Sequence, residues 1–325
     1  MPSPPASSPA QPAAPTGIAL WIVGARPRTL PVSVAPVLVG VACAANAVAT
    51  PWFLHISWWR VGLALVVSLA LQIGVNYAND YSDGVRGSDN DRVGPLRLTG
   101  SGAVPARRVK IAAFASFAIA GLCGLALAAS TSWWLLVVGS AAIAAAWFYT
   151  GGSSPYGYRG LGDISVFVFF GLVAVMGTAY VSADRPRLTV LALACSIPVG
   201  LLAVAVLVAN NLRDLPKDAL VDKRTSAVRL GDHRTRILYS AIMVAPTIMG
   251  VAIVITAAGR SVVAVVAGIV LVLAAGLLVI FPVRKVLASA AGRELIPVLA
   301  RTGQVQLVYA VALSAALLLR VGALA

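Results

Sequence analysis

Residues 188–210 read LTVLALACSIPVGLLAVAVLVAN, an uncharged stretch that runs directly into the polar segment Asn211-Leu-Arg-Asp-Leu-Pro-Lys-Asp218. The hydrocarbon core of a bilayer is about 30 Å thick, and a helix of about 20 apolar residues crosses it. The stretch therefore predicts a transmembrane helix. Eight others resemble it, and the nine candidate spans are 29–48, 58–80, 109–129, 132–150, 162–182, 188–210, 236–257, 261–282 and 304–323. We expect an all-α polytopic membrane protein with about nine transmembrane helices.

The composition of the chain supports this class. Of its 325 residues, 59% are hydrophobic and 11% are charged, with a mean hydropathy of +0.90. Soluble domains carry about 25% charged residues. No basic run is interleaved with aromatic residues, so the net charge of +14 does not indicate nucleic-acid binding. Residues 1–16 are rich in Pro, Ala and Ser and predict a disordered tail without a cleavable signal peptide, followed by a single transmembrane domain at 17–325.

The basic residues indicate how the chain crosses the membrane. With nine spans the connections alternate between the two sides, and one side holds all but five of the 25 Lys and Arg residues. The five on the other side are Arg60, Arg185, Arg187, Arg260 and Arg320. Cytoplasmic loops of membrane proteins accumulate Lys and Arg. We therefore expect the N-terminus in the cytoplasm, and an odd number of spans would leave the C-terminus outside.

Two acidic segments stand at the cytoplasmic ends of the second and sixth spans, Asn76-Tyr-Ala-Asn-Asp-Tyr-Ser-Asp83 and Asn210-Asn-Leu-Arg-Asp-Leu-Pro-Lys-Asp218. Carboxylates at a membrane boundary are costly and often functional. On a helix, Asn76, Asp80 and Asp83 share one face, and Asp214 and Asp218 share another. Pro216 makes the second face less secure, because it could end or kink the helix.

These segments predict a site for a divalent cation and, through it, a phosphorylated substrate. Mg²⁺ prefers oxygen ligands and binds substrate phosphates beside one or two carboxylates. Neither segment contains His or Cys, which argues against zinc, copper or haem. The alternative is that the carboxylates only pair with neighbouring Arg and Lys, and we favour that alternative for Asp89, Asp91 and Asp232.

The same residues resemble the intramembrane prenyltransferases of the UbiA superfamily. The matching motifs are Asn79-Asp80-Tyr-Ser-Asp83 and Asp214-Leu-Pro-Lys-Asp218. Further similar stretches are Gly24–Pro31, Asn79–Asp89, Asp91–Arg97, Pro155–Asp163, Asn210–Asp214 and Lys223–Thr225. The resemblance implies a ring of nine transmembrane helices around a central cavity, in agreement with the independent count of spans.

One departure bears on the substrate. Many members of the superfamily carry a third Asp four residues after the position of Asp83, whereas this chain has Gly87. Gly at this point resembles the branch that acts on 1,4-dihydroxy-2-naphthoate in menaquinone synthesis. The resemblance then implies Mg²⁺-dependent transfer of a polyprenyl group from polyprenyl diphosphate to 1,4-dihydroxy-2-naphthoate. The ring carboxylate would leave as CO₂ and give a demethylmenaquinone. Alternatives are another aromatic acid, 4-hydroxybenzoate or homogentisate, and a membrane cation or solute transporter.

The candidate site residues fall into four groups. The metal–diphosphate group is Asn76, Asn79, Asp80, Asp83, Asp214 and Asp218. Candidates to neutralise the diphosphate are Arg86, Arg92, Lys217, Lys223 and Arg224. Candidates to meet the acceptor are Arg26, Arg28, Arg159 and Asn211.

The fourth group is catalytic. Asp163 could accept a proton from an acceptor hydroxyl or could pair with Arg159, and Tyr149 could stabilise developing positive charge from an aromatic cavity wall. That wall would also include Tyr156, Tyr158 and the run 167–170. We expect a multi-pass protein of the bacterial plasma membrane whose active site opens towards the cytoplasm.

Overall fold

The computed structural model describes residues 16–48, 50–87, 96–221, 223–257 and 261–322. Residues 1–15 of the predicted tail 1–16, and the predictions for Asp89, Asp91 and Arg92, fall outside these residues. The α-helices are α1 (Ile18–Ala25), α2 (Pro31–Ala45), α3 (Trp58–Val85), α4 (Ala106–Ser130), α5 (Leu135–Phe148), α6 (Gly162–Val166), α7 (Ala174–Ser182), α8 (Val190–Leu220), α9 (Ser226–Ala257), α10 (Val262–Leu277), α11 (Ile280–Leu287) and α12 (Leu295–Gly322). Short 3₁₀ turns lie at η1 (Pro27–Thr29), η2 (Trp52–His55), η3 (Tyr156–Arg159) and η5 (Gly292–Glu294), and η4 (Phe167–Val173) is a π-helix.

Seven helical segments among the described residues are long and apolar enough to cross a membrane, as expected of a multi-pass all-α protein. They are Trp58–Val85, Ala106–Ser130, Gly162–Ser182, Val190–Leu220, Ser226–Ala257, Val262–Leu287 and Gly292–Leu319. An eighth results if Ile18–Thr29 and Pro31–Ala45, which are bent by 53°, count as one broken span. Leu135–Phe148 is apolar but has only 14 residues. The ninth crossing therefore stays a prediction.

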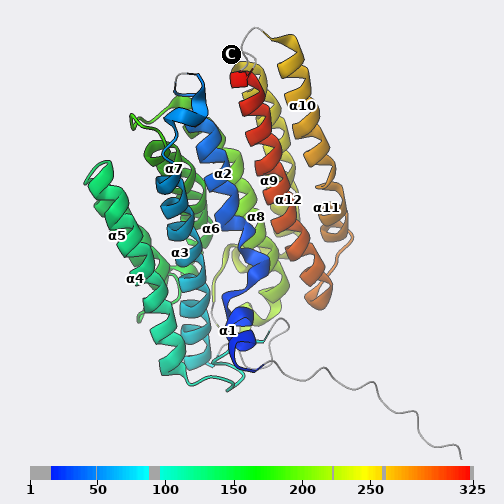
Figure 1. Ribbon diagram of the computed structural model, residues 1–325. Coiled ribbons are helices and arrows are strands. Elements are labelled where there is room, and N and C mark those ends of the chain that lie inside the picture. Colours follow the sequence, from blue (N-terminus) through cyan, green and yellow to red (C-terminus); the bar gives the residue numbers. More distant parts are fainter. Residues whose placement is uncertain (1–15, 49, 88–95, 222, 258–260, 323–325) are drawn as a thin grey trace, which may run out of the picture.

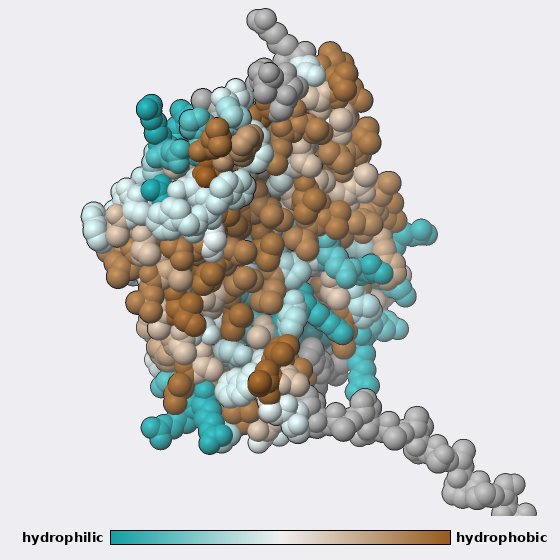
Figure 2. Space-filling view, in the orientation of Figure 1, coloured by the Kyte–Doolittle hydropathy of each residue, from teal (hydrophilic) through white to brown (hydrophobic). Residues whose placement is uncertain are grey.

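The helices stand side by side, and the polar ends of α3 and α8 lie at the end of the molecule where α1 lies (Figure 1). The far end of α12 lies at the opposite end of the bundle (Figure 1). Apolar side chains cover most of the middle of the face seen in Figure 2, and hydrophilic side chains gather at the upper left, at the lower left and along the right side from mid-height downwards. This distribution matches a bundle whose middle is surrounded by hydrocarbon.

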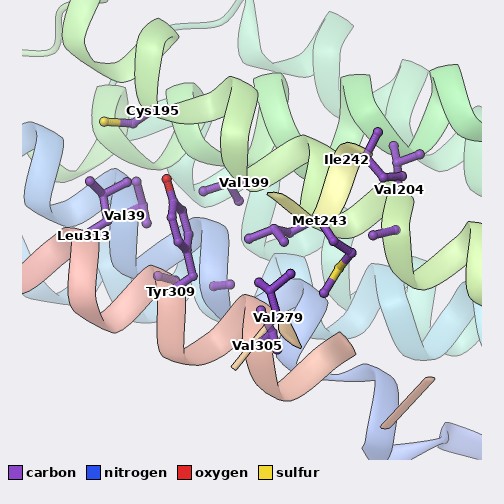
Figure 3. Packing of buried hydrophobic residues seen from close by; sticks show 14 of the residues in the cluster. Val39, Cys195, Val199, Val204, Ile242, Met243, Val279, Val305, Tyr309 and Leu313 are labelled. Carbon is purple, nitrogen blue, oxygen red and sulfur yellow. The ribbon is translucent and has the colours of Figure 1, made fainter. Parts of the chain in front are cut away.

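The main apolar core occupies the half of the bundle built from α2, α8, α9, α10 and α12. Tyr309 points from α12 into this core, where Val39 of α2 and Val199 of α8 lie beside it (Figure 3). The hydroxyl of Tyr309 donates a hydrogen bond of 2.8 Å to the carbonyl of Pro246. Pro246 lies inside α9, so this bond provides the buried phenol with an acceptor inside the apolar cluster. Helix α8 belongs to this core and also lines a cavity on its other side.

Candidate active site

A cavity of about 480 Å³ lies between α3, α4, α5, the α6–η4–α7 segment and α8. Its lining along α3 extends from Ala64 to Asp83, a distance of about 28 Å at 1.5 Å per residue. Polar side chains gather at the end marked by Asp83, whereas the other end is bounded by residues such as Leu127 and Val181. The cavity therefore combines a polar head with a long apolar passage.

Helix α3 supplies one side of the polar end. The helix continues past the expected span end at residue 80 to Val85, so the first acidic segment is helical. Asn76, Asn79 and Asp83 line the cavity. Gly87 follows the helix with a left-handed φ of 72°, a conformation in which glycine avoids the strain of a Cβ atom. The structure thus provides a local backbone reason for glycine at position 87.

Asp80 faces away from the cavity lining and holds a loop. Its side chain is fully buried, and its two oxygens accept hydrogen bonds from the backbone N–H groups of Leu98, at 2.8 Å, and Thr99, at 2.9 Å. A buried carboxylate is stabilised by such donors. In this arrangement Asp80 fixes residues 97–99 against α3, next to the cavity.

Tyr158 connects the two acidic segments. Its hydroxyl donates a hydrogen bond of 2.7 Å to Oδ1 of Asp83. On its ring lies the ammonium of Lys223, 5.1 Å from the ring centroid, and Nζ of Lys223 is 3.6 Å from Oδ1 of Asp218. The end of α3 and the end of α8 therefore meet through one tyrosine and one lysine.

Helix α8 supplies the opposite side. It continues through Pro216 to Leu220, so Asp214 and Asp218 are on the helix as the spacing required. Asn210 and Asn211 line the cavity. Asp214 accepts two hydrogen bonds from Arg213, at 2.8 Å from Nε and 2.7 Å from Nη2. Asp214 and Asp218 are buried but are not part of the cavity lining.

The basic candidates divide by position. Arg26 and Lys223 line the cavity. Arg86 is held by the loop after α5, because its guanidinium donates to the carbonyls of Thr150 and Gly152, each at 2.5 Å. The candidates outside the cavity lining are Arg28, Arg86, Arg159, Lys217 and Arg224, and Arg92 lies outside the described residues.

The two catalytic candidates are not equivalent. Tyr149 lines the cavity, with its ring edge-to-face against Tyr156 at a centroid distance of 5.6 Å. Asp163 does not line the cavity, and no ion pair joins it to Arg159, although the structure describes both residues. The Arg159 guanidinium instead donates to Ser154 Oγ. Asp232, for which pairing with a neighbour was expected, is 2.6 Å from Nε of Arg236.

The aromatic wall was partly predicted. Tyr149, Tyr156, Phe169 and Phe170 line the cavity, whereas Tyr158 and Phe167 do not. The hydroxyl of Tyr156 donates a hydrogen bond of 2.8 Å to the carbonyl of Ala145. Burial raises the pKa of Tyr156, and its hydrogen bond with Ser165 acts in the opposite direction. Tyr156 is therefore a neutral donor at ordinary pH.

Several polar lining residues were not among the candidates, and three of them are close to the acidic segment of α3. Arg97 lines the cavity, and its Nη2 is 4.0 Å from Oδ2 of Asp83. Thr150 donates a hydrogen bond of 2.8 Å to Oδ1 of Asn79. Gln72 is one helical turn before Asn76 and could have been found by extending the helix face. Arg97 and Thr150 are outside helices, and only the folded chain brings them to α3.

The donor set of the polar end fits a hard cation. Within the described residues, no three His, Cys, Asp or Glu side chains converge closely enough to enclose a metal ion. The lining instead offers one carboxylate, Asp83, together with the amide oxygens of Asn76, Asn79, Asn210 and Asn211. Mg²⁺ is commonly held by one or two carboxylates and completed by water and substrate phosphate. An oxygen-only site open to a cavity suits that mode of binding.

Comparison with known proteins finds relatives that are all prenyltransferases of one family. Residues 33–291 match the UbiA prenyltransferase family. A 1,4-dihydroxy-2-naphthoate octaprenyltransferase from Mycobacterium tuberculosis is 50% identical over 299 residues, which are 92% of this chain and 97% of the relative. The Escherichia coli protein of the same name is 39% identical over 239 residues, covering 69% of this chain and 72% of its own.

Solved structures share the fold. A UbiA homologue from Aeropyrum pernix K1 superposes with a TM-score of 0.65 at 16% identity, covering 89% of this chain and 96% of its own. A homologue from Archaeoglobus fulgidus bound to GPP and Mg²⁺ gives 0.63 at 14% identity, covering 92% and 99%. These low identities support the fold alone. The family match over residues 33–291 and the 50% identity to the mycobacterial relative establish that this chain belongs to the UbiA prenyltransferase family.

Proposed function

We propose that this protein transfers a polyprenyl group from polyprenyl diphosphate to 1,4-dihydroxy-2-naphthoate, with loss of the ring carboxylate. The observation that carries the proposal is the 50% identity, over 92% of the chain, to a 1,4-dihydroxy-2-naphthoate octaprenyltransferase. The cavity supports it, because a polar head and an apolar passage, which together extend about 28 Å along α3, match a charged diphosphate and a hydrocarbon tail. We further propose that residues 17–325 act as one transmembrane domain.

The metal–diphosphate site is proposed to comprise the six predicted residues of the two acidic segments: Asn76, Asn79, Asp80, Asp83, Asp214 and Asp218. When bound there, Mg²⁺ would neutralise part of the diphosphate charge and favour its departure. Asp83 is the carboxylate that lines the cavity, whereas Asp80 positions the loop that carries Arg97. Of the five predicted diphosphate-binding residues, Lys223 lines the cavity, and Arg97 joins it from outside that set. Both can compensate the negative charge as the leaving group forms.

The chemical step follows from this placement. The bond between the allylic carbon and the diphosphate oxygen breaks, and the bonding pair leaves with the diphosphate. The electron-rich ring of the acceptor forms the new carbon–carbon bond, and its carboxylate leaves as CO₂, which restores aromaticity. The apolar walls exclude water from the cationic carbon. Tyr149 and Phe169 line the cavity and can face this charge.

The acceptor is proposed to bind beside α1 and α8. Arg26 lines the cavity and donates from Nη2 to the carbonyl of Asn76 at 3.4 Å, and Asn211 lines it from α8. Their donors could meet the acceptor carboxylate. Arg28 and Arg159 are exposed and lie outside the cavity lining, so they would act on the approach rather than on the bound acceptor. A proton moving from the acceptor to Asp163 would need an intervening group, because Asp163 does not line the cavity.

We propose that the polar end of the cavity opens towards the cytoplasm of a bacterial plasma membrane, because the connections at this end carry most of the Lys and Arg residues. A transporter is less consistent with the fold, since its acidic residues would be expected near the middle of the bilayer. Here the carboxylates lie at the ends of α3 and α8.

The function can be tested with membranes that contain the protein, a polyprenyl diphosphate and Mg²⁺. Parallel reactions would contain 1,4-dihydroxy-2-naphthoate, 4-hydroxybenzoate or homogentisate. We expect a prenylated product and CO₂ release with dihydroxynaphthoate, and loss of both when a chelator removes divalent cations. Absence of product from dihydroxynaphthoate would overturn the proposal, and product from another acid alone would reassign the acceptor.

A further inference from the structure

Three glycines line the apolar part of the cavity at positions where a side chain, if one were present, would project into empty space. They are Gly124 on α4, Gly139 on α5 and Gly177 on α7. For each, no atom outside the local helix backbone lies within 4 Å of an ideally placed Cβ. We name these three residues the outer glycines. All three are half-buried, as expected of residues that face an internal cavity.

The outer glycines lie at a similar depth. Gly124 is six residues before the end of α4, Gly139 four residues after the start of α5, and Gly177 five residues before the end of α7. At 1.5 Å per residue, each is about 6–9 Å from that helix end. These helix ends lie at the end of the molecule away from α1 (Figure 1). The outer glycines therefore surround the part of the cavity farthest from Asp83.

At other positions in the bundle, glycine is needed because a neighbouring helix packs closely against it, which is not the case at the outer glycines. A Cβ at Gly171 would lie 2.7 Å from the Cα of Gly200, and one at Gly74 would collide with the ring of Phe117. Glycine is less favourable than alanine inside a helix, so a close helix contact explains those two positions. At the outer glycines, a side chain would meet only the open cavity.

We propose that the outer glycines determine the longest prenyl chain that the enzyme accepts, by keeping the far part of the cavity open. This inference rests on the proposed prenyl transfer. With the diphosphate at Asp83 and Lys223, the tail extends along α3 towards Ala64, which lies at about the depth of the outer glycines. A short donor ends before this depth, whereas a long donor has to reach it. A larger side chain here would obstruct only the long donor.

The test compares two donors in the full-length protein. Glycine-to-leucine variants at the three positions, G124L, G139L and G177L, are assayed with geranyl and octaprenyl diphosphate and dihydroxynaphthoate as acceptor. We expect the ratio of kcat/KM for octaprenyl to that for geranyl diphosphate to fall about tenfold or more in each variant, since the added methylenes occupy the space of the tail. A variant with two leucines should lower the ratio further.

Gly62 is the matched control. It lies on α3, is exposed, has no atom within 4 Å of its Cβ position and does not line the cavity. G62L should keep the wild-type ratio. An unchanged ratio in the outer-glycine variants, or an equal loss with both donors, would overturn the inference. If the wild-type protein prenylates no acceptor, the proposed function fails instead. Competition between geranyl and octaprenyl diphosphate for the purified protein would then still test the glycines.

Discussion

At the scale of single residues, two carboxylates three positions apart do different work. Asp80 is fully buried, and both of its oxygens accept backbone N–H bonds from Leu98 and Thr99. Asp83 lines the cavity and accepts the hydroxyl of Tyr158. The two carboxylates project from one face of α3, but Asp80 meets the loop at residues 97–99 whereas Asp83 meets the cavity. The motif therefore combines a residue that holds a loop with a residue that faces the cavity.

This difference can be measured with Asp80→Asn and Asp83→Asn. An asparagine at position 80 can accept only one of the two bonds and places its NH₂ against the other N–H, so we expect a loss of about 1–3 kcal/mol of stability together with lower transfer. Asp83→Asn should keep most of the stability but raise the Mg²⁺ concentration needed for half-maximal transfer. Thermal unfolding in detergent and Mg²⁺ titration of the activity check this. Near wild-type transfer in both variants would contradict the proposed site.

Tyr158 offers a second test at this scale. Tyr158→Phe removes the hydroxyl that bonds Asp83 but keeps the ring beneath Lys223, so only one of the two links is lost. A hydrogen bond to a charged group contributes about 1.5–3 kcal/mol. We expect KM for the diphosphate donor to rise about tenfold or more, with a smaller change for the acceptor. Steady-state kinetics with each substrate varied in turn measure this split. Tyr180→Phe is the control that should leave both values unchanged, because Tyr180 packs against Trp134 and is outside the cavity lining. An equal rise in both KM values for Tyr158→Phe would indicate general damage.

At the scale of elements, some helices are longer or more broken than the apolar stretches that predicted them. The span expected at 236–257 is part of α9, which begins at Ser226 and carries a left-handed Gly231 with φ of 76°. The span expected at 162–182 is divided into α6, the π-helix η4 and α7. A π-turn shifts the register of side chains, and in η4 it accompanies the close approach of Gly171 to Gly200 of α8. Both η4 and α8 contribute lining residues to the cavity.

The contact between η4 and α8 should be sensitive to a single methyl group. In Gly171→Ala the new Cβ would lie 2.7 Å from the Cα of Gly200, and overpacking of this kind costs about 1–3 kcal/mol. Gly177→Ala, four residues after η4, adds the same methyl group in open space and should be neutral or slightly stabilising. The thermal unfolding midpoint of the purified proteins distinguishes them. Equal midpoints for the two variants would show that the helices can separate without cost.

At the scale of the whole molecule, the bundle divides into a dense half and a hollow half. The apolar core fills the space between α2, α8, α9, α10 and α12, and α8 belongs to both the core and the cavity wall. The acidic segments of α3 and α8 lie at the end where α1 lies, opposite to the far end of α12 (Figure 1). An odd number of crossings would place these two ends on opposite sides of the membrane.

Reporter fusions test this orientation. A fluorescent protein that folds only in the cytoplasm should be bright at the N-terminus, and alkaline phosphatase should be active at the C-terminus, because the loops near α1 carry most of the positive charge. In the control, alkaline phosphatase is fused to the N-terminus and the fluorescent protein to the C-terminus, and neither reporter should give a signal. A bright cytoplasmic reporter at the C-terminus would mean an even number of crossings, and Leu135–Phe148 would then be the first segment to reconsider.

The sequence by itself determined the class of the protein, the approximate position of every helix over a candidate span, and the two acidic helix faces, because apolar length and helical spacing are local properties. It also indicated the family through short motifs. Helix ends were less predictable, since α9 and α12 extend into polar residues that hydropathy does not count. Only the tertiary structure decided that Tyr158 joins Asp83 to Lys223, that Asp80 supports residues 97–99, and that the outer glycines face open space. Those facts depend on how residues distant in the chain pack against each other, and a helical repeat does not specify which neighbour each face will meet.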